Sequence, residues 1–168
     1  MITPEHDITT TDHPLDTVEQ ILHMNEWQFD RADDDELAFT LRGQSCTYRI
    51  FFIWDAALQT MQMCCQYDFK IDLEASPQAL LSTAKINEQL WLGHFDIPST
   101  KNVPCFRYAS LMHGVAEDDY TAHLEHVIDI ALAQCEQYYP ALHMLSGDSA
   151  NDNPQGFNLA MMDVQGHS

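Results

Sequence analysis

Apolar residues recur along the chain with two different spacings, and these spacings predict its helices and strands. Spacings of three and four residues, typical of a helix with one buried side, occur in residues 14–25, 77–92 and 115–139. Alternation of apolar residues with other residues, typical of strands, occurs in residues 27–31, 37–42, 45–54, 59–69, 94–97 and 103–112. The predicted order is α-β-β-β-β-α-β-β-α, an α+β fold in which helices pack on an antiparallel sheet.

The stretch of residues 76–112 is expected to be the one around which the rest of the chain packs. Ser76 and Pro77 form a helix start signal, because Ser can cap free N–H groups and Pro loses no hydrogen bond at the first helical position. Gly93 is expected to end this helix, and a β-hairpin follows. The buried side of the helix is predicted to consist of Leu80, Leu81, Ala84, Asn87, Leu90 and Trp91.

The first and last helices each have a clear apolar side. In the first helix it consists of Leu15, Val18, Ile21 and Leu22. In the last it consists of Tyr120, Leu124, Val127, Ile128, Ala131, Leu132, Cys135 and Tyr138. Pro140 is expected either to end or to kink the last helix. Strand 45–54 carries bulky residues on both sides, which predicts a central strand with partial cover over its second face.

The length of 168 residues favours one domain with a substantial core, predicted over residues 14–145. Residues 1–13 are polar and without periodicity, so we expect a disordered segment. Residues 146–168 are predicted to be a flexible linker and a short apolar tail, which could dock on this domain or on a partner. The apolar residues of the tail are Phe157, Leu159, Ala160, Met161, Met162 and Val164.

The composition predicts a cytoplasmic protein with reduced thiols. No basic segment followed by an apolar run begins the chain, and no apolar run approaches the roughly 20 residues of a membrane helix. The five cysteines are an odd number without a C-x-x-C motif, so we expect them to be reduced and mostly buried.

The net charge is −19, from 7 basic and 26 acidic residues. A positive surface is needed to bind nucleic acid or an anionic membrane, so neither partner is expected. Two interpretations of the acidic surface stay open. It keeps the protein soluble, or it attracts cationic segments of a partner protein.

No catalytic or nucleotide-binding motif occurs in the sequence, so we predict neither an enzyme nor a cofactor. The candidate metal ligands are Asp119, His123 and His126, but their spacing lacks the further ligand of a zinc site, and no metal is predicted. His94 and His113 flank the hairpin and could face each other. Together with Cys105, these histidines would line the pocket of an alternative ligand-binding protein or enzyme.

Arg49 and Arg107 are predicted in the middle of strands, in a chain with few basic residues. An arginine in such a position needs a carboxylate or another anionic partner. Ion pairing within the protein satisfies this need. Binding of the backbone or a carboxylate of a partner by the arginine satisfies it as well.

The sequence Asn87-Glu88-Gln89-Leu90-Trp91-Leu92-Gly93-His94-Phe95-Asp96, followed by Cys105-Phe106-Arg107-Tyr108, resembles the YbjN family of small bacterial proteins. The resemblance covers about residues 14–145. Members are described as sensory transduction regulators, and their fold resembles type III secretion chaperones. The resemblance implies a cytoplasmic, non-enzymatic protein, with effects on stress responses, motility or surface properties suggested for some members. It supplies no ligand and no catalytic residue.

The resulting prediction is a non-enzymatic interaction module, chaperone-like or regulatory, that binds a segment of a partner protein in the bacterial cytosol. The fold analogy adds a homodimer, through the sheet or the last helix, whose sheet and grooves hold an extended segment. The alternative is a small-ligand-binding protein or enzyme with a pocket between sheet and helices. The candidate partner-binding residues are Arg49, Trp54, Trp91, His94, Phe95 and Arg107.

Overall fold

The computed structural model describes residues 13–147. In order along the chain, its elements are α1 (Pro14–Met24), β1 (Phe29–Arg31), β2 (Glu36–Arg42), β3 (Thr47–Asp55), β4 (Thr60–Gln66), α2 (Gln78–Asn87), β5 (His94–Asp96), β6 (Cys105–Leu111), a 3-10 turn (Glu117–Asp119) and α3 (Tyr120–Met144). The predicted segments therefore all contain the expected type of element. The predictions for residues 1–12 and 148–168 lie outside the described residues.

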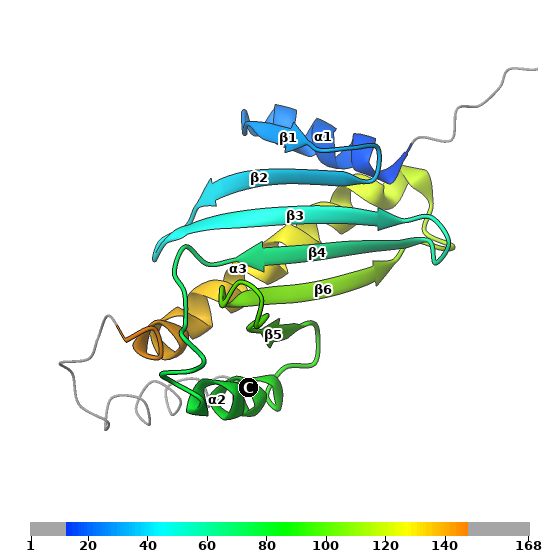
Figure 1. Ribbon diagram of the computed structural model, residues 1–168. Helices are drawn as coiled ribbons and strands as arrows, with labels where there is room; N and C mark the ends of the chain where they lie inside the picture. Colours follow the sequence, from blue (N-terminus) through cyan, green and yellow to red (C-terminus); the bar gives the residue numbers. More distant parts are fainter. Residues whose placement is uncertain (1–12, 148–168) are drawn as a thin grey trace, which may run out of the picture.

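The strands form one six-stranded antiparallel sheet in the order β1-β2-β3-β4-β6-β5 (Figure 1). The first four strands are a meander, as predicted. The hairpin of β5 and β6 joins this meander through β6, which pairs with β4. The sequence of elements and the antiparallel pairing confirm the predicted α+β class.

Helices α1 and α3 pack on the same face of the sheet, behind the strands in Figure 1, while α2 lies beside β5 at one edge. The apolar side predicted for α1 is fully buried there, and so is most of the side predicted for α3. Helix α3 continues through Pro140 to Met144, so Pro140 does not end it. None of the helices among residues 13–147 is long and apolar enough to cross a membrane.

The other face of the sheet, which we call the open face, is not covered by any helix among the described residues. The prediction of partial cover over the second face of β3 is therefore wrong for this part of the chain. Alternation along the three strands β3, β4 and β6 places one set of side chains on this face. They include Arg49, Phe51, Ile53, Gln62, Cys64, Arg107 and Ala109.

Helix α2 differs most from its prediction. Its buried residues are Ala79, Ser82, Thr83 and Ile86. Leu80 and Leu81, which we expected to be buried, are 53% and 62% exposed. The hydroxyl of Thr83 donates to the carbonyl oxygen of Ala79 within the helix, so this polar residue can be buried with its hydrogen bond satisfied.

The ends of α2 and its place in the fold also differ from expectation. The helix begins at Gln78 after Pro77 without a side-chain cap, and only the backbone carbonyl of Ser76 accepts a hydrogen bond, from the N–H of Ala79. It ends at Asn87, six residues before the predicted stop at Gly93. Because α2 packs at the edge against β5, the core is centred instead on β3 and β4 with α1 and α3. The expectation that the chain packs around residues 76–112 is wrong.

Candidate binding groove on the open face

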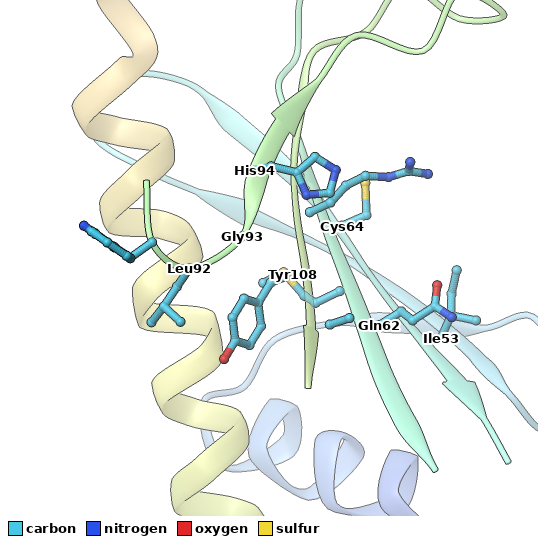
Figure 2. A pocket seen from close by; sticks show the side chains of 11 residues that line it. Ile53, Gln62, Cys64, Leu92, Gly93, His94 and Tyr108 are labelled. Carbon is cyan, nitrogen blue, oxygen red and sulfur yellow. The ribbon is translucent and has the colours of Figure 1, made fainter. Parts of the chain in front are cut away.

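A groove of about 590 Å³ runs over the open face, from β3 across β4 and β6 to the turn between α2 and β5 (Figure 2). Strand β5 has only three residues, so the turn that precedes it lies next to the part of β6 that β5 does not cover. The lining is a mixture of apolar and polar residues. It consists of Ile53, Gln62, Met63, Cys64, Trp91, Leu92, Gly93, His94, Arg107, Tyr108 and Ala109.

The floor of the groove follows from the register of the strands. In one row across the sheet, Phe51 pairs with Cys64, Cys64 pairs with Arg107, and Arg107 pairs with His94. In the next row, Ile53 pairs with Gln62, and Gln62 pairs with Ala109. Paired residues point to the same face of a sheet, so both rows lie on the open face, and all of their members except Phe51 line the groove.

The wall of the groove is the turn 88–93, which two local features hold in place. The side-chain amide of Asn87 donates to the carbonyl oxygen of Phe95 at 2.9 Å and accepts from its backbone N–H at 2.7 Å. Gly93 has a φ of +69°, and a Cβ at this position would lie 2.3 Å from the Phe106 ring. Only glycine adopts this conformation at such a close approach. The turn thereby presents Trp91, which is 100% exposed, at the rim.

Arg107 supplies the positive charge of the groove. Its guanidinium donates to Asp96 Oδ2 at 3.2 Å, and both side chains are about half exposed. An exposed ion pair of this kind contributes little to stability, about 0–1 kcal/mol. A guanidinium has five N–H donors, so donors are left for a second carboxylate. The structure thus contains the ion pair predicted for Arg107 and leaves the anchor role open.

Two further arginines lie on the open face. Arg49 is exposed, with its guanidinium 4.9 Å from the centre of the Phe51 ring, a cation–π contact. Arg42 donates to the hydroxyl of Thr47. Three of the seven basic residues of the chain are therefore on one face of the sheet, in a protein of net charge −19.

Cys64 is half-buried in the floor of the groove. The Cys105 thiol, by hydrogen bonding, and the Arg107 guanidinium together hold the pKa of Cys64 below its ordinary value, against the opposing effects of burial and of Asp96. Both contacts favour the thiolate. The pKa of Cys105 is raised, first by its hydrogen bond with Cys64 and then by burial.

The structure brings together three of the six predicted partner-binding residues. Trp91, His94 and Arg107 line the groove, and Arg49 lies on the same face beyond it. Phe95 is 2% exposed and packs against Phe106 and Tyr138, so its prediction as a contact residue is wrong.

Trp54 lies away from the groove, beside His13, and lines a separate hollow of about 320 Å³. His113 is in the same hollow and contacts Gln59. His94 and His113 therefore do not face each other, and Cys105 is only 1% exposed. The pocket that the alternative function placed between sheet and helices, lined by these three residues, is not formed in the described part of the chain.

The candidate metal ligands do not converge. Among residues 13–147, no three His, Cys, Asp or Glu side chains are arranged to hold a metal ion. His123 instead shares a hydrogen bond with the hydroxyl of Ser110.

Sequence reasoning missed eight of the eleven residues that line the groove, namely Ile53, Gln62, Met63, Cys64, Leu92, Gly93, Tyr108 and Ala109. The alternation of residues 59–69 correctly assigns Gln62 and Cys64 to the face opposite Met61 and Met63. What it could not supply is the pairing of β4 with β6, because these strands are not consecutive in the sequence.

The structure is an α+β fold with an antiparallel sheet that has helices on one face and is open on the other, and the comparisons assign its family. The YbjN family, described as "Putative bacterial sensory transduction regulator", matches residues 14–144. The chain belongs to this family, as the resemblance predicted. No curated protein sequence matches it.

A solved structure was also found: the crystal structure of YbjN from E. coli, described as "a putative transcription regulator". Its identity with this chain is 14% and the TM-score is 0.48. The matched region covers 74% of this chain and 93% of that one.

Proposed function

We propose that this chain is a non-enzymatic regulatory module that binds an extended segment of a partner protein in the groove on its open face. The observation that carries the proposal is the sheet itself, which is covered by helices on one face and hollowed on the other. The description of the family as regulators supports the regulatory part of this role. The bacterial cytosol stays the predicted location.

The chemistry of the groove favours a segment that combines apolar and acidic side chains. Ile53, Ala109 and Trp91 offer apolar contacts, and aromatic and arginine residues often dominate such interfaces. Arg107 at the groove, with Arg49 and Arg42 on the same face, favours carboxylates in the segment. The binding of a cationic partner stays a prediction, and it concerns the acidic surface outside the groove.

A library of displayed random octapeptides, selected on the full chain, tests this proposal. We expect enriched peptides that combine apolar residues with Asp or Glu. Ile53→Asp and Arg107→Gln should each weaken the binding of these peptides about tenfold or more, the order expected for a central contact residue. Lys101→Gln is the matched control, because it removes one exposed positive charge outside the groove and should leave binding unchanged. Peptides that bind all four proteins equally would place the site elsewhere.

A second copy of this chain is the competing occupant, since a homodimer through the sheet was also predicted. Light scattering on a sizing column separates the two cases. A dimer that Ile53→Asp dissociates would assign the open face to self-association and contradict partner binding at the free face. A monomer, or a dimer that this variant does not affect, leaves the open face to the partner.

Binding of a small molecule is a second candidate function, favoured by the size of the groove. Its volume of about 590 Å³ lies within the range of ligand pockets, roughly 300–1,000 Å³. Arg107 and His94 would select a carboxylate-bearing apolar molecule. Thermal shifts with a panel of aromatic and aliphatic carboxylic acids test this, and shifts that Arg107→Gln abolishes would favour the small ligand.

A further inference from the structure

The reactive groups of the groove gather around Cys64. Cys64 pairs with Arg107 across β4 and β6, while Cys105 lies two residues before Arg107 on the same face of β6. Cys105 pairs with Gln66, which makes it the diagonal neighbour of Cys64. The two thiols are therefore neighbours across β4 and β6, and Cys64 is the one that lines the groove.

The charges around Cys64 come from several elements. Strand β6 contributes Arg107, and β5 contributes His94 and Asp96. Asp96 opposes a thiolate, but its carboxylate is paired with Arg107 at 3.2 Å. On the other side, β3 presents the ring of Phe51, with the guanidinium of Arg49 beyond it. Arg107, the cross-strand partner of Cys64, is therefore the cation that stabilises a thiolate there, and a cation beside the thiol is typical of reactive cysteines.

We propose that Cys64 is a thiol modification site, whose thiolate reacts with hydroperoxides and soft carbon electrophiles that enter the groove. Arg107 stabilises its negative charge, and the Cys105 thiol donates a hydrogen bond to it. Cys105 is a positioning residue, because it acts through Cys64 and is itself buried.

The reaction with a hydroperoxide is a two-electron transfer. The Cys64 thiolate attacks the terminal oxygen of the hydroperoxide, a sulfur–oxygen bond forms, and the oxygen–oxygen bond breaks. Cys64 becomes a sulfenic acid, and the hydroperoxide is reduced and leaves as an alkoxide that takes a proton from water. A thiol reductant reverses the modification. With a soft electrophile such as iodoacetamide, sulfur forms the carbon bond and iodide leaves.

The other four cysteines are internal controls, because each of them is buried. Cys46, Cys65, Cys105 and Cys135 are each 3% exposed or less. Burial raises the pKa of Cys46 to about 11. The pKa of Cys65 is also raised, by its hydrogen bond with Cys135 and by burial. A buried, protonated thiol reacts slowly with both classes of reagent.

Modification at this position has a consequence that rests on the proposed function. A group attached to Cys64 occupies the floor of the groove, so it would displace the bound segment. The site itself does not depend on that function, because the reactivity of Cys64 is measured in the absence of any partner.

The test is site-resolved alkylation of the native full chain by iodoacetamide, read by mass spectrometry. At about pH 6.5, where an ordinary thiol is roughly 1% thiolate, we expect Cys64 to react about tenfold faster than each other cysteine. Equal rates, or a faster reaction of another cysteine, would overturn the proposal. With hydrogen peroxide and dimedone, the sulfenic acid adduct should form at Cys64, and its absence there would overturn the hydroperoxide reaction.

Variants separate the activating groups from general exposure of the thiol. Arg107→Met and Cys105→Ala should shift the pH dependence of Cys64 alkylation to higher pH, with about tenfold less thiolate for each pKa unit at low pH. Arg49→Met, an arginine of the same face that contacts Phe51, should leave that profile unchanged. If the pH dependence of Cys64 alkylation is the same in all of these proteins, Arg107 and Cys105 do not activate Cys64. If the unmodified chain binds no peptide while Cys64 is still reactive, the proposed function is contradicted and the modification site is not.

Discussion

The side-chain amide of Asn87 pairs with both backbone groups of Phe95, accepting from its N–H at 2.7 Å and donating to its carbonyl oxygen at 2.9 Å. Asn87 is the last residue of α2, and Phe95 is the middle residue of the short strand β5. The pair therefore ties the end of the helix to the edge of the sheet. It also closes the turn 88–93 into the wall of the groove.

Asn87→Ala removes two hydrogen bonds and leaves the backbone groups of Phe95 without that partner. We expect the free energy of unfolding, measured with urea, to fall by about 1–3 kcal/mol. Asn25→Ala is the control, because the side-chain amide of Asn25 donates a single hydrogen bond, to the carbonyl oxygen of Ile21 at the end of α1. It should cost less. Equal losses of unfolding free energy in the two variants would show that the two hydrogen bonds between Asn87 and Phe95 do not hold the turn.

Gly93→Ala is expected to lower the free energy of unfolding by about 2–4 kcal/mol, because it combines left-handed strain with overpacking. The new Cβ would lie 2.3 Å from the Phe106 ring and 2.7 Å from the carbonyl oxygen of Arg107. Gly114→Ala is the matched control, with a φ of +81° and no atom within 4 Å of its Cβ. At Gly114 only the left-handed backbone strain applies, so the free energy of unfolding should fall by about 1–2 kcal/mol. Thermal unfolding distinguishes the two, and similar losses would contradict the close approach at Gly93.

Glu136 on α3 holds the turn between β2 and β3. Its carboxylate accepts from the backbone N–H of Gln44 at 2.7 Å and of Ser45 at 3.1 Å, and from the Ser45 hydroxyl. Burial raises the pKa of Glu136, but the hydrogen bonds from Ser45 and Gln44 outweigh it and hold the pKa below 4.5. A depressed pKa contributes stability above about pH 4.5, which is lost as the pH falls through the folded-state value.

Glu136→Gln should therefore lower the free energy of unfolding by about 1 kcal/mol at neutral pH, a modest loss because Glu136 is only partly buried. The difference from the unmodified protein should shrink as the pH falls below about 4.5, in urea titrations across that range. Glu125→Gln, on the exposed side of the same helix, should change stability little at any pH. A loss for Glu136→Gln that is independent of pH would rule out the ionised carboxylate as its source.

Much of the fold could be predicted from the sequence, because strong periodicity marks its central elements. Leu15, Val18, Ile21 and Leu22 identify the buried side of α1, and alternation identifies β2, β3 and β4. The buried side of helix α2 could not be predicted in this way. Its buried side carries Ser82 and Thr83, while Leu80 and Leu81 are exposed.

The candidate site could be predicted only in part. Trp91, His94 and Arg107 stood out by residue type and by their place around the hairpin. Cys64 did not, because its significance depends on the register that sets it opposite Arg107. That register is a contact between distant parts of the chain, and local patterns do not contain it.

The central claim is that a partner segment binds the open face, and a chemical-shift map tests it most directly. The isotope-labelled full chain would be titrated with an octapeptide of alternating leucine and glutamate. The account predicts that the largest shifts fall on Ile53, Gln62, Gly93 and Ala109, around the groove. Shifts concentrated instead on Leu80 and Leu81, the exposed apolar side of α2, would contradict it.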